Sequence, residues 1–482
     1  MLKHRKPEWR SRAPAYATAA VMGIGFVFSM AASLPGHLSY DSVIQLLEGR
    51  TAIYSGWHPP VMSWLLGLGD RLLPGAALFV VAVALLFFGS LLSLLWLIPR
   101  ISWAAPVVGA LCIATPQVLL YQGIVWKDVL FADCAVAGFV ALAHVPPNWN
   151  LPLRRRLLIA VAVLGLSVAA LTRQNGLLLL PFGAFALGRI ARRSGAGPRA
   201  TWFAAGGFSV CVVGLTLAAS ALFALRTAPE RGVSKEIRIL EFYDLNGGLS
   251  LAPDLRLPEL ARSGPALLAL MRSDGRKLYS PVRSDTLVRS QRLQGALADA
   301  PDDILHRPWL DFVIQKPVLY LRERANVFRW VFLTPDISLC VPYVVGLRGP
   351  SQTMSELGLQ TRVSTRDKLM DSYGEALMRT PLFSHLTFLL LALCELGFLL
   401  LRRRRADMAF TSMLLGAIAF CASFFFISIA CDYRYFYVLD LAALSTLFYI
   451  SLDPRGLTHS RRPRCRHYWG AGIAIETTFS VK

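Results

Sequence analysis

Charged side chains that could bind an anion or take up a proton stand at the ends of several long apolar runs. Asp41 is the candidate base, because a carboxylate beside an apolar surface can have its pKa raised towards working pH. Lys127 offers a point charge for a phosphate, while Arg173 and Arg434 offer guanidinium groups that can hold a phosphate through two parallel hydrogen bonds. His58 can hydrogen bond to a phosphate or a hydroxyl group. These residue types predict a site in which a base faces a bound anion.

Each of these residues also has a structural explanation that the sequence leaves open. Asp41 could cap a helix, since aspartate favours that position. Lys127 could form an ion pair at a helix end, and such pairs contribute little to stability when they are exposed. Arg173 and Arg434 could extend to lipid headgroups. His58 could form a hydrogen bond within its own loop.

The elements that must position these residues are membrane-spanning helices. Of the 482 residues, 55% are hydrophobic and only 17% are charged, whereas soluble domains carry about a quarter charged residues. The apolar residues form blocks of roughly 20, the length that crosses about 30 Å of hydrocarbon. We therefore predict an all-α polytopic membrane protein with about ten transmembrane helices. The predicted spans lie near residues 15–34, 76–98, 103–121, 129–145, 155–172, 175–190, 201–225, 383–401, 408–430 and 434–452.

Basic residues are concentrated in every second connection between these spans, for example in Arg154–Arg156 and Arg402–Arg405. The positive-inside rule then places both termini in the cytoplasm and Asp41 on the outer face. A basic start followed by the apolar run Ala15–Leu34, with no clear small-residue cleavage site, predicts an uncleaved first span. We expect the chain to lie in the inner (cytoplasmic) membrane of a bacterium. The net charge of +20 reflects this orientation, and we expect no nucleic-acid partner, since no such motif is present.

Four regions follow from this reading. Residues 1–225 form an N-terminal transmembrane module with a first outer loop at 35–75. Residues 226–382, rich in Pro, Gly, Asp and Arg, form a mainly helical extracytoplasmic insertion. Residues 383–452 hold the last transmembrane helices, and residues 453–482 form a basic cytoplasmic tail.

The first outer loop predicts two juxtamembrane helices on the outer face. The Ser42–Gln45 stretch matches a helix capping box, which places Asp41 just before a helix that ends near Gly49. The Trp57–Pro60 stretch begins a second helix, because proline is tolerated in a first turn. Its apolar residues recur at helical spacing, so we expect this helix to lie along the membrane surface.

The insertion and the cysteines carry weaker patterns. The segment Pro308–Trp330 mixes arginines with apolar residues, as an interfacial helix would, although a helix packed inside the outer domain explains it equally well. Eight cysteines are present, most of them inside apolar runs and without CxxC or CxxH spacing. We therefore predict neither a disulfide framework nor a zinc site.

At the candidate residues the chain resembles the GT-C superfamily of membrane glycosyltransferases, similar to protein mannosyltransferases and aminoarabinose transferase-like enzymes. The likeness covers about 1–225 and 383–452, and it leaves 226–382 without a matched motif. Four elements carry it: Tyr40-Asp41-Ser42 with Trp57-His58-Pro59-Pro60, then Trp126-Lys127-Asp128, Thr172-Arg173-Gln174-Asn175-Gly176, and Asp432-Tyr433-Arg434-Tyr435-Phe436-Tyr437.

The resemblance implies transfer of a sugar from a polyprenyl-phosphate carrier to a hydroxyl group of a protein, lipid or polysaccharide acceptor on the extracytoplasmic face. It implies that Asp41 is the catalytic base. A single base with direct displacement predicts inversion of the anomeric configuration. The implied substrate-binding residues are His58, Lys127, Asp128, Arg173, Tyr433, Arg434 and Tyr435. Many relatives place two adjacent acidic residues in the first loop, whereas Ser42 follows Asp41 here. No metal ligand is therefore assigned, and a divalent metal stays open.

Three carboxylates lie within predicted spans, where a charged group is costly and suggests a function. Asp133 and Asp440 are each about 9 Å along a helix from Lys127 and Arg434, and we expect them to line the outer cavity and hold those cations. Glu395 has no assigned role. An ion-coupled transporter or flippase using these three carboxylates is one alternative. A polysaccharide polymerase or ligase, with its essential residues in 226–382, is another.

Overall fold

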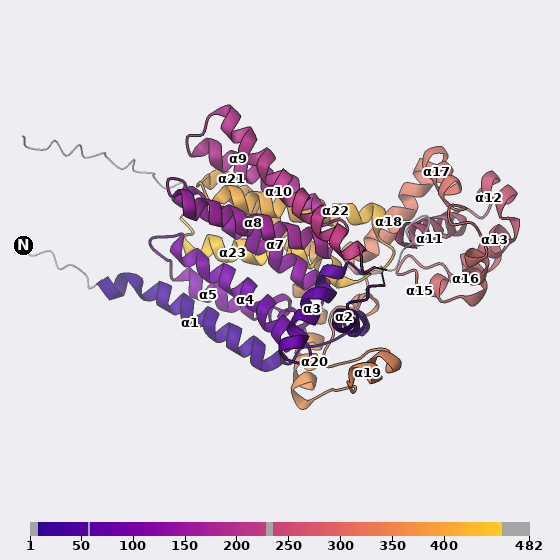
Figure 1. Cartoon of the computed structure of the whole chain (residues 1–482), viewed down its shortest axis with the longest axis horizontal. Coiled ribbons are helices and arrows are strands. Elements are labelled where there is room, and N and C mark those ends of the chain that lie inside the picture. Colours follow the sequence, from indigo (N-terminus) through magenta and orange to yellow (C-terminus); the bar gives the residue numbers. More distant parts are fainter. Residues whose placement is uncertain (1–7, 56–57, 228–234, 456–482) are drawn as a thin grey trace, which may run out of the picture.

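The computed structural model describes residues 8–55, 58–227 and 235–455. This part of the chain is built from helices, turns and five isolated β-bridges, with no β-strand. A long helical bundle carries a smaller helical lobe at one end (Figure 1). The chain is thus an all-α polytopic membrane protein, as predicted. The segments 1–7, 56–57, 228–234 and 456–482 lie outside the described residues, and they include Trp57 and most of the predicted basic tail.

Within the described residues, seven helices are long and apolar enough to cross a membrane. They are α1 (Glu8–Ser33), α4 (Ala77–Ser93) with the turn Leu94–Trp96, α8 (Pro152–Thr172), α10 (Pro198–Ala224), α21 (His385–Arg402), α22 (Asp407–Ile427), and α23 (Tyr437–Leu452) with the preceding turn Tyr433–Phe436. A bent pair, α5 (Ala104–Ile113) and α6 (Pro116–Leu119) with the turn Tyr121–Gly123, makes an eighth span when counted as one. Its two halves meet at 66°, where Pro116 begins the second half in the position that proline favours.

The other two predicted spans are helices of the bundle that fall short of the length or composition of a span. α7 (Lys127–His144) contains Lys127, Asp128 and Asp133, and α9 (Leu180–Arg193) has only 14 residues, fewer than the roughly 20 that a full crossing needs. α7 packs against α4, α8, α22 and α23, and every residue from Asp128 to Ala143 is buried. A helix enclosed by other helices on all sides can hold polar groups that lipid would not tolerate.

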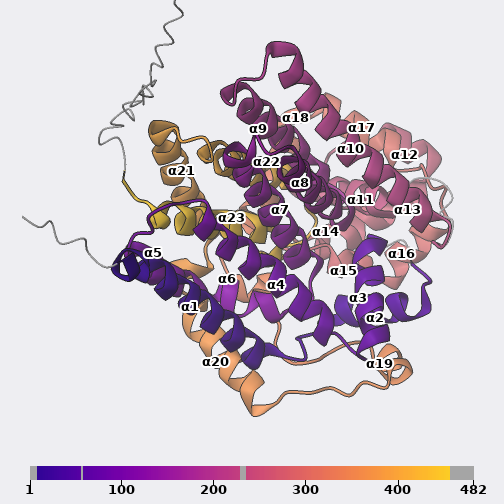
Figure 2. The ribbon, with the colours of Figure 1, turned by 60° about the vertical axis from the view of Figure 1, so that its left-hand side comes forward.

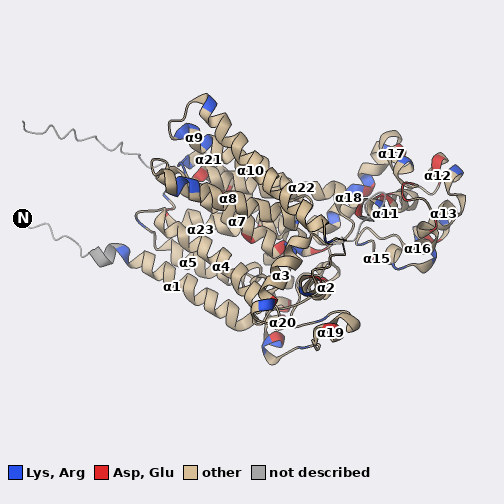
Figure 3. Cartoon of the chain, in the orientation of Figure 1, with Lys and Arg blue, Asp and Glu red and all other residues tan. Residues whose placement is uncertain are grey.

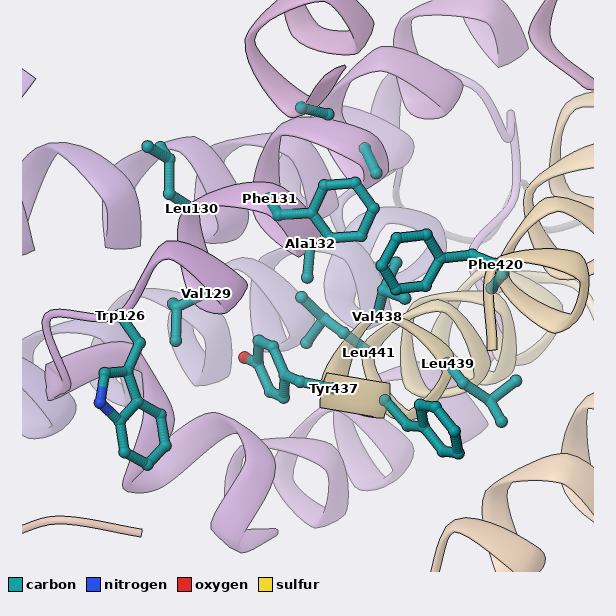
Figure 4. Packing of buried hydrophobic residues seen from close by; sticks show 14 of the residues in the cluster. Trp126, Val129, Leu130, Phe131, Ala132, Phe420, Tyr437, Val438, Leu439 and Leu441 are labelled. Carbon is teal, nitrogen blue, oxygen red and sulfur yellow. The ribbon is translucent and has the colours of Figure 1, made fainter. Parts of the chain in front are cut away.

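Aromatic side chains fix α7 against the C-terminal helices (Figure 4). The rings of Phe131 and Phe420 lie 4.6 Å apart, and Tyr437 stacks on Tyr121 at 4.7 Å. Trp126, just before α7, contacts Tyr121 edge to face. This packing brings the start of α7 beside the start of α23, although about 300 residues separate them in the sequence. The Lys127 and Arg434 segments are therefore neighbours.

The first loop folds into α2 (Tyr40–Thr51) and α3 (Pro60–Leu72). Their backbones touch where Gly49 faces Gly67, and a Cβ atom on Gly49 would lie 2.1 Å from the Ser63 carbonyl oxygen. The predicted N-cap of the first helix, Ser42, is wrong by three residues. Ser39 is the N-cap, and its backbone N–H donates to Ser42 Oγ at 3.2 Å. Asp41 therefore lies inside the first turn and does not cap the helix.

The insertion forms two parts. One is the lobe at the right of Figure 1, built from α11 (Lys235–Leu251), α12 (Pro258–Ser263), α13 (Pro265–Leu270), α14 (Arg276–Leu278), α15 (Asp285–Val288), α16 (Gln291–Ala298), α17 (His306–Gln315) and α18 (Pro317–Leu333). The other, α19 (Ser351–Leu357) and α20 (Thr365–Met378), lies beside α1 and α2 (Figure 2). Arg366 ties α20 to the end of α1 by donating to the carbonyl oxygens of Ala31 and Leu34.

α18 packs within the lobe. The prediction that its arginines lie at the membrane interface is therefore wrong for Arg324. Arg324 is fully buried and donates to Asp244 Oδ1 at 2.8 Å and to the Ser428 carbonyl oxygen. Arg322 and Arg329 are exposed. Arg324 thus joins the lobe to the segment that follows α22.

A disulfide joins Cys340 to Cys431, which corrects the prediction that no disulfide forms. The two cysteines lack a short motif because they are 91 residues apart in sequence, and only the fold brings them together. The bond attaches the end of the lobe to the residue just before Asp432. It closes a loop that contains α19, α20, α21 and α22.

Removing this bond is expected to loosen the lobe. Substituting Cys340→Ser in the purified protein should lower stability by about 2–4 kcal/mol, because the unfolded chain regains the freedom of a long loop. The midpoint of thermal unfolding in detergent measures the effect, and reductant should lower the wild-type midpoint to the same value. Cys211→Ser, at an exposed free cysteine, is the matched control and should leave the midpoint unchanged. An unchanged midpoint for Cys340→Ser would show that the bond does not contribute.

Candidate functional site

A cavity of about 440 Å³ lies where the first loop, the starts of α7 and α23, the end of α22 and the start of the lobe meet. Six of the eight predicted site residues line it. The lining residues are Asp41, His58, Pro59, Lys127, Arg173, Gln174, Asn175, Glu236, Ile237, Leu240, Phe424, Ile427, Ser428, Ile429, Arg434 and Tyr435. Asp128 and Tyr433 are the two predicted residues that do not line the cavity. The fold thus gathers four motifs that are far apart in the sequence.

Short backbone contacts set the first loop against the start of α7. His37 forms a parallel bridge with Ile124: its N–H donates to the Gly123 carbonyl oxygen, and its own carbonyl oxygen accepts from the Val125 N–H. Ser42 Oγ donates to the Val125 carbonyl oxygen at 2.5 Å, and Trp126 Nε1 donates to Ser39 Oγ at 3.0 Å. These bonds fix the first turn of α2, and with it Asp41, beside Lys127.

Arg434 is the centre of the charges around the cavity. Its Nη2 atom bonds Asp41 Oδ2 at 2.9 Å and Asp432 Oδ2 at 3.1 Å, while its Nε lies 3.7 Å from Asp128 Oδ2. The guanidinium also lies over the ring of Trp126, 4.9 Å from its centre. Contacts on all sides hold this group in one orientation, which the sequence motif alone could not specify.

Arg173 is positioned by a carboxylate behind it and aromatic rings around it. It forms an ion pair with the buried Asp128. Its guanidinium lies 5.2 Å from the ring centre of Phe424 and 5.1 Å from that of Tyr435. Asp128 is therefore a support for Arg173 and Arg434. A contact between Asp128 and substrate stays a prediction.

Lys127 has no ion-pair partner among the residues that the structure describes. Its ammonium group lines the cavity near Arg173, Arg434, Asp128 and Asp41. The alternative explanation, in which Lys127 only forms an ion pair at a helix end, is therefore wrong. Of the three cations, Lys127 is the one least committed to protein carboxylates.

Asp41 and His58 face each other across the mouth of the cavity. His58 Nε2 lies 4.0 Å from Asp41 Oδ1. Burial, together with the nearby charge of Lys127, lowers the pKa of His58 to about 4, so this histidine is neutral at working pH. Burial would raise the pKa of Asp41, but Arg434, His58 and Lys127 outweigh it and hold the pKa below the usual value. The predicted rise in the pKa of Asp41 is thus wrong.

The two predicted tyrosines point to opposite sides of the turn Tyr433–Phe436. Tyr435 lines the cavity. Tyr433 points into the bundle, where its hydroxyl donates to Asp440 Oδ2 at 2.8 Å and accepts from Gln117 Nε2 at 2.9 Å. Tyr433 thus anchors the turn to the bundle, and its side chain does not line the cavity.

The carboxylates within the bundle do not hold the cavity cations, which corrects that expectation. Asp133 accepts from Gln122 Nε2 at 3.0 Å, and Asp440 pairs with His385 Nδ1 at 3.0 Å as well as with Tyr433. Glu395 is buried, and neither of its carboxylate oxygens has a hydrogen-bond partner among the described residues. Lys127 and Arg434 instead face Asp41, Asp128 and Asp432.

Several lining residues were not singled out from the sequence. Phe424 and Ile427 supply an apolar wall at the end of α22, and Ile427 is 43% exposed on the outside of the bundle. Glu236, in the first turn of α11, brings a further carboxylate from the insertion. Apolar residues at a helix end and an acidic residue in a helix first turn are both common, so neither gives a recognisable signal.

A metal ion does not fit the side chains present. Arg434 lies among the carboxylates of Asp41, Asp128 and Asp432 and takes the place that a cation would need. Within residues 8–55, 58–227 and 235–455, no group of three or more His, Cys, Asp or Glu side chains could hold a metal ion. The positive charge in this cavity comes from Lys127, Arg173 and Arg434.

No family model matches the chain, and no curated protein matches it. Among solved structures, the chain is similar to an archaeal oligosaccharyltransferase. That protein, AglB from Archaeoglobus fulgidus, is in complex with an inhibitory peptide and a dolichol-phosphate. The identity is 12% and the TM-score 0.39, over 90% of this chain and 50% of that chain. The present chain thus spans about half the length of AglB, and a likeness this distant assigns no activity.

Proposed function

We propose that the chain is a membrane glycosyltransferase of the GT-C type, which moves a sugar from a polyprenyl-phosphate carrier to a hydroxyl acceptor. The observation that carries the proposal is the make-up of the cavity. Asp41 lines the same cavity as Lys127, Arg173 and Arg434, and an apolar wall of Phe424 and Ile427 runs from this polar group to the outside of the bundle. A lipid phosphate needs charged groups to bind its phosphate and apolar groups to bind its lipid chain, and this cavity has both.

The carrier phosphate is placed against the three cations. Lys127 is free to act as a point charge, and the planar guanidinium groups of Arg173 and Arg434 can add directed hydrogen bonds. The isoprenoid chain then leaves along Phe424 and Ile427 into the bilayer, where burial of apolar surface stabilises it. His58 is neutral and can donate to or accept from the sugar or the acceptor.

The reaction is a single displacement at the anomeric carbon. The acceptor oxygen attacks this carbon, and the bond between the carbon and the phosphate oxygen breaks. Asp41 takes the hydroxyl proton, and the cations stabilise the charge that develops on the departing polyprenyl phosphate. One displacement inverts the anomeric configuration, and a product with retained configuration would contradict this mechanism.

Donor binding also makes Asp41 a stronger base. Arg434, His58 and Lys127 outweigh the effect of burial and hold the pKa of Asp41 below its usual value. A phosphate bound to Lys127 and Arg434 neutralises part of that charge, so the pKa of Asp41 rises and the carboxylate becomes a stronger base. Asp41 is then activated only when the donor is in place.

We place the site on the extracytoplasmic face of the membrane. Lys and Arg gather at the turns beside α8 and α9, at the end of the bundle away from the lobe (Figure 3), which supports a cytoplasmic location for that end. The Cys340–Cys431 bond lies at the other end, and disulfides persist in oxidising compartments. A bacterial inner membrane with both termini in the cytoplasm fits this orientation. The acceptor is a protein, a lipid or a polysaccharide.

The alternatives find less support in the fold. A transporter using Asp133, Glu395 and Asp440 would need these groups to form a path. Asp133 is tied to Gln122, while Asp440 is tied to His385 and Tyr433. A polymerase or ligase with its essential residues in the insertion would not need the first-loop carboxylate. Substitution of Asp41 therefore distinguishes this alternative from the transferase.

The direct test is transfer by the purified protein in lipid vesicles. The vesicles contain a pool of radiolabelled polyprenyl-phosphate sugars and membrane-derived acceptors, and label is followed from carrier to acceptor. Vesicles without protein and vesicles with heat-unfolded protein are the controls. Protein-dependent loss of label from the carrier supports the transferase. A folded protein that neither binds a polyprenyl phosphate nor consumes any labelled carrier would overturn it.

Lys127→Met should weaken donor binding, because methionine keeps an apolar stem but cannot bind a phosphate. A hydrogen bond to a charged group contributes about 1.5–3 kcal/mol, so the KM for the carrier should rise roughly ten- to 150-fold. Lys277→Met, at an exposed lysine of the lobe, is the matched control and should behave as wild type. An unchanged KM for folded Lys127→Met would exclude Lys127 from phosphate binding.

A further inference from the structure

The insertion is attached directly to the segment that presents Arg434. Its backbone pairs with residues just before Asp432: Ser284 N–H donates to the Ile429 carbonyl oxygen at 2.9 Å, and Cys431 N–H donates to the Val282 carbonyl oxygen at 2.6 Å. Arg283 and Ala430 form the isolated antiparallel bridge between these two stretches. The lobe thus reaches the edge of the cavity.

The side chain of Arg283 continues this contact towards the cavity charges. Its Nη2 atom donates to the carbonyl oxygens of Leu339 at 2.7 Å and Cys431 at 3.1 Å. The same atom lies 3.4 Å from Asp432 Oδ1, while Asp432 Oδ2 bonds Arg434 Nη2 at 3.1 Å. Asp432 is therefore shared between an arginine of the insertion and the central arginine of the cavity.

We propose that Arg283 is a positioning residue, through which the insertion sets how Arg434 presents itself to the carrier phosphate. This inference rests on the proposed function. Arg283 draws part of the charge of Asp432 away from Arg434 and fixes the orientation of the carboxylate. Without Arg283, Asp432 is free to pair fully with Arg434 Nη2, the atom that also bonds Asp41, and competes there with the phosphate.

The Arg283 side chain can be removed without removing the backbone attachment. The bonds of Val282 and Ser284 are main-chain bonds, and Cys340–Cys431 holds the same segment independently. Arg289 gives a matched control on the same stretch. It lies near the same carboxylate, Asp285, as Arg283 does, but it is 83% exposed and forms no ion pair with Asp432 within the described part of the chain.

Binding of farnesyl phosphate to the full-length protein in detergent tests the proposal. Groups in one ion-pair network couple by about 0.5–3 kcal/mol, so Arg283→Gln should raise the Kd roughly two- to 150-fold. Arg289→Gln should bind as wild type does, and Arg283→Lys, which keeps the charge, should recover part of the affinity. In transfer, KM should rise while kcat changes little.

A double-substitution cycle separates positioning from general loosening of the lobe. If Arg283 acts through Asp432, then Arg283→Gln should have no further effect on Kd in an Asp432→Asn background. Equal effects in both backgrounds, or an Arg283→Gln protein that binds as wild type does, would overturn the inference and leave the proposed function intact. A folded wild type that does not bind farnesyl phosphate would overturn both.

Discussion

Asp41→Asn should transfer sugar about 10²–10⁴-fold more slowly than wild type while still binding the carrier. Asparagine keeps the shape of the side chain but cannot accept the acceptor proton. It can still accept a hydrogen bond from Arg434 Nη2, which bonds Asp41 at 2.9 Å, so the cavity should keep its form. The measurement is kcat for transfer from the labelled carrier, together with the Kd for farnesyl phosphate.

Asp432→Asn is the matched control for Asp41. Both carboxylates bond the same nitrogen of Arg434, but only Asp41 lines the cavity. If Asp41 served only to orient Arg434, the two substitutions would slow transfer to a similar extent. We expect a much larger loss of kcat for Asp41→Asn. Transfer by Asp41→Asn at the wild-type rate would exclude Asp41 as the base and favour a polymerase-like site in the insertion.

Arg324→Leu should destabilise the protein more than any other single substitution in the lobe. Arg324 is fully buried between Asp244 and Glu323, and removing one partner of a buried ion pair costs about 3–5 kcal/mol. Burial already raises the pKa of Asp244 and that of Glu323, while Arg324 opposes the rise. Loss of the guanidinium leaves two buried carboxyl groups without a cation. The thermal unfolding midpoint in detergent should fall clearly.

The control and the pH dependence make this prediction specific. Arg322→Leu, on the exposed side of the same helix, should leave the midpoint almost unchanged. In Arg324→Leu the two carboxyl groups titrate at raised pKa values in the folded state. The folded protein then binds more protons than the unfolded chain, so stability falls as pH rises above the ordinary carboxyl range. A variant as stable as wild type at every pH would contradict the role of Arg324.

The candidate residues could be found from the sequence because each carries a local signal. Asp41, Lys127, Arg173 and Arg434 are charged residues at the ends of apolar runs, and their order matches a family pattern. The residue at which a helix begins was harder to predict, because it depends on contacts with other parts of the chain. Ser39 rather than Ser42 caps α2, because both serines fit the cap chemistry and only the packing against Val125 decides between them.

Partners across long sequence separations could not be found in the same way. The expectation that Asp133 and Asp440 hold Lys127 and Arg434 came from distances along single helices. The actual partners are Gln122, His385 and Tyr433. Hydrogen-bond partners of buried groups are set by which helices lie side by side, and the sequence does not state this.

By itself, the sequence determined that the chain crosses a membrane many times, and it determined where the charged residues stand relative to the apolar runs. Both follow from composition and helix geometry, which act locally. The tertiary structure alone decided that Arg434 lies among Asp41, Asp128 and Asp432, that Cys340 meets Cys431, and that the insertion reaches the cavity through Arg283. It also reversed the expected shift in the pKa of Asp41, because the effect of burial and the effect of neighbouring charges oppose each other and only their distances decide which is larger.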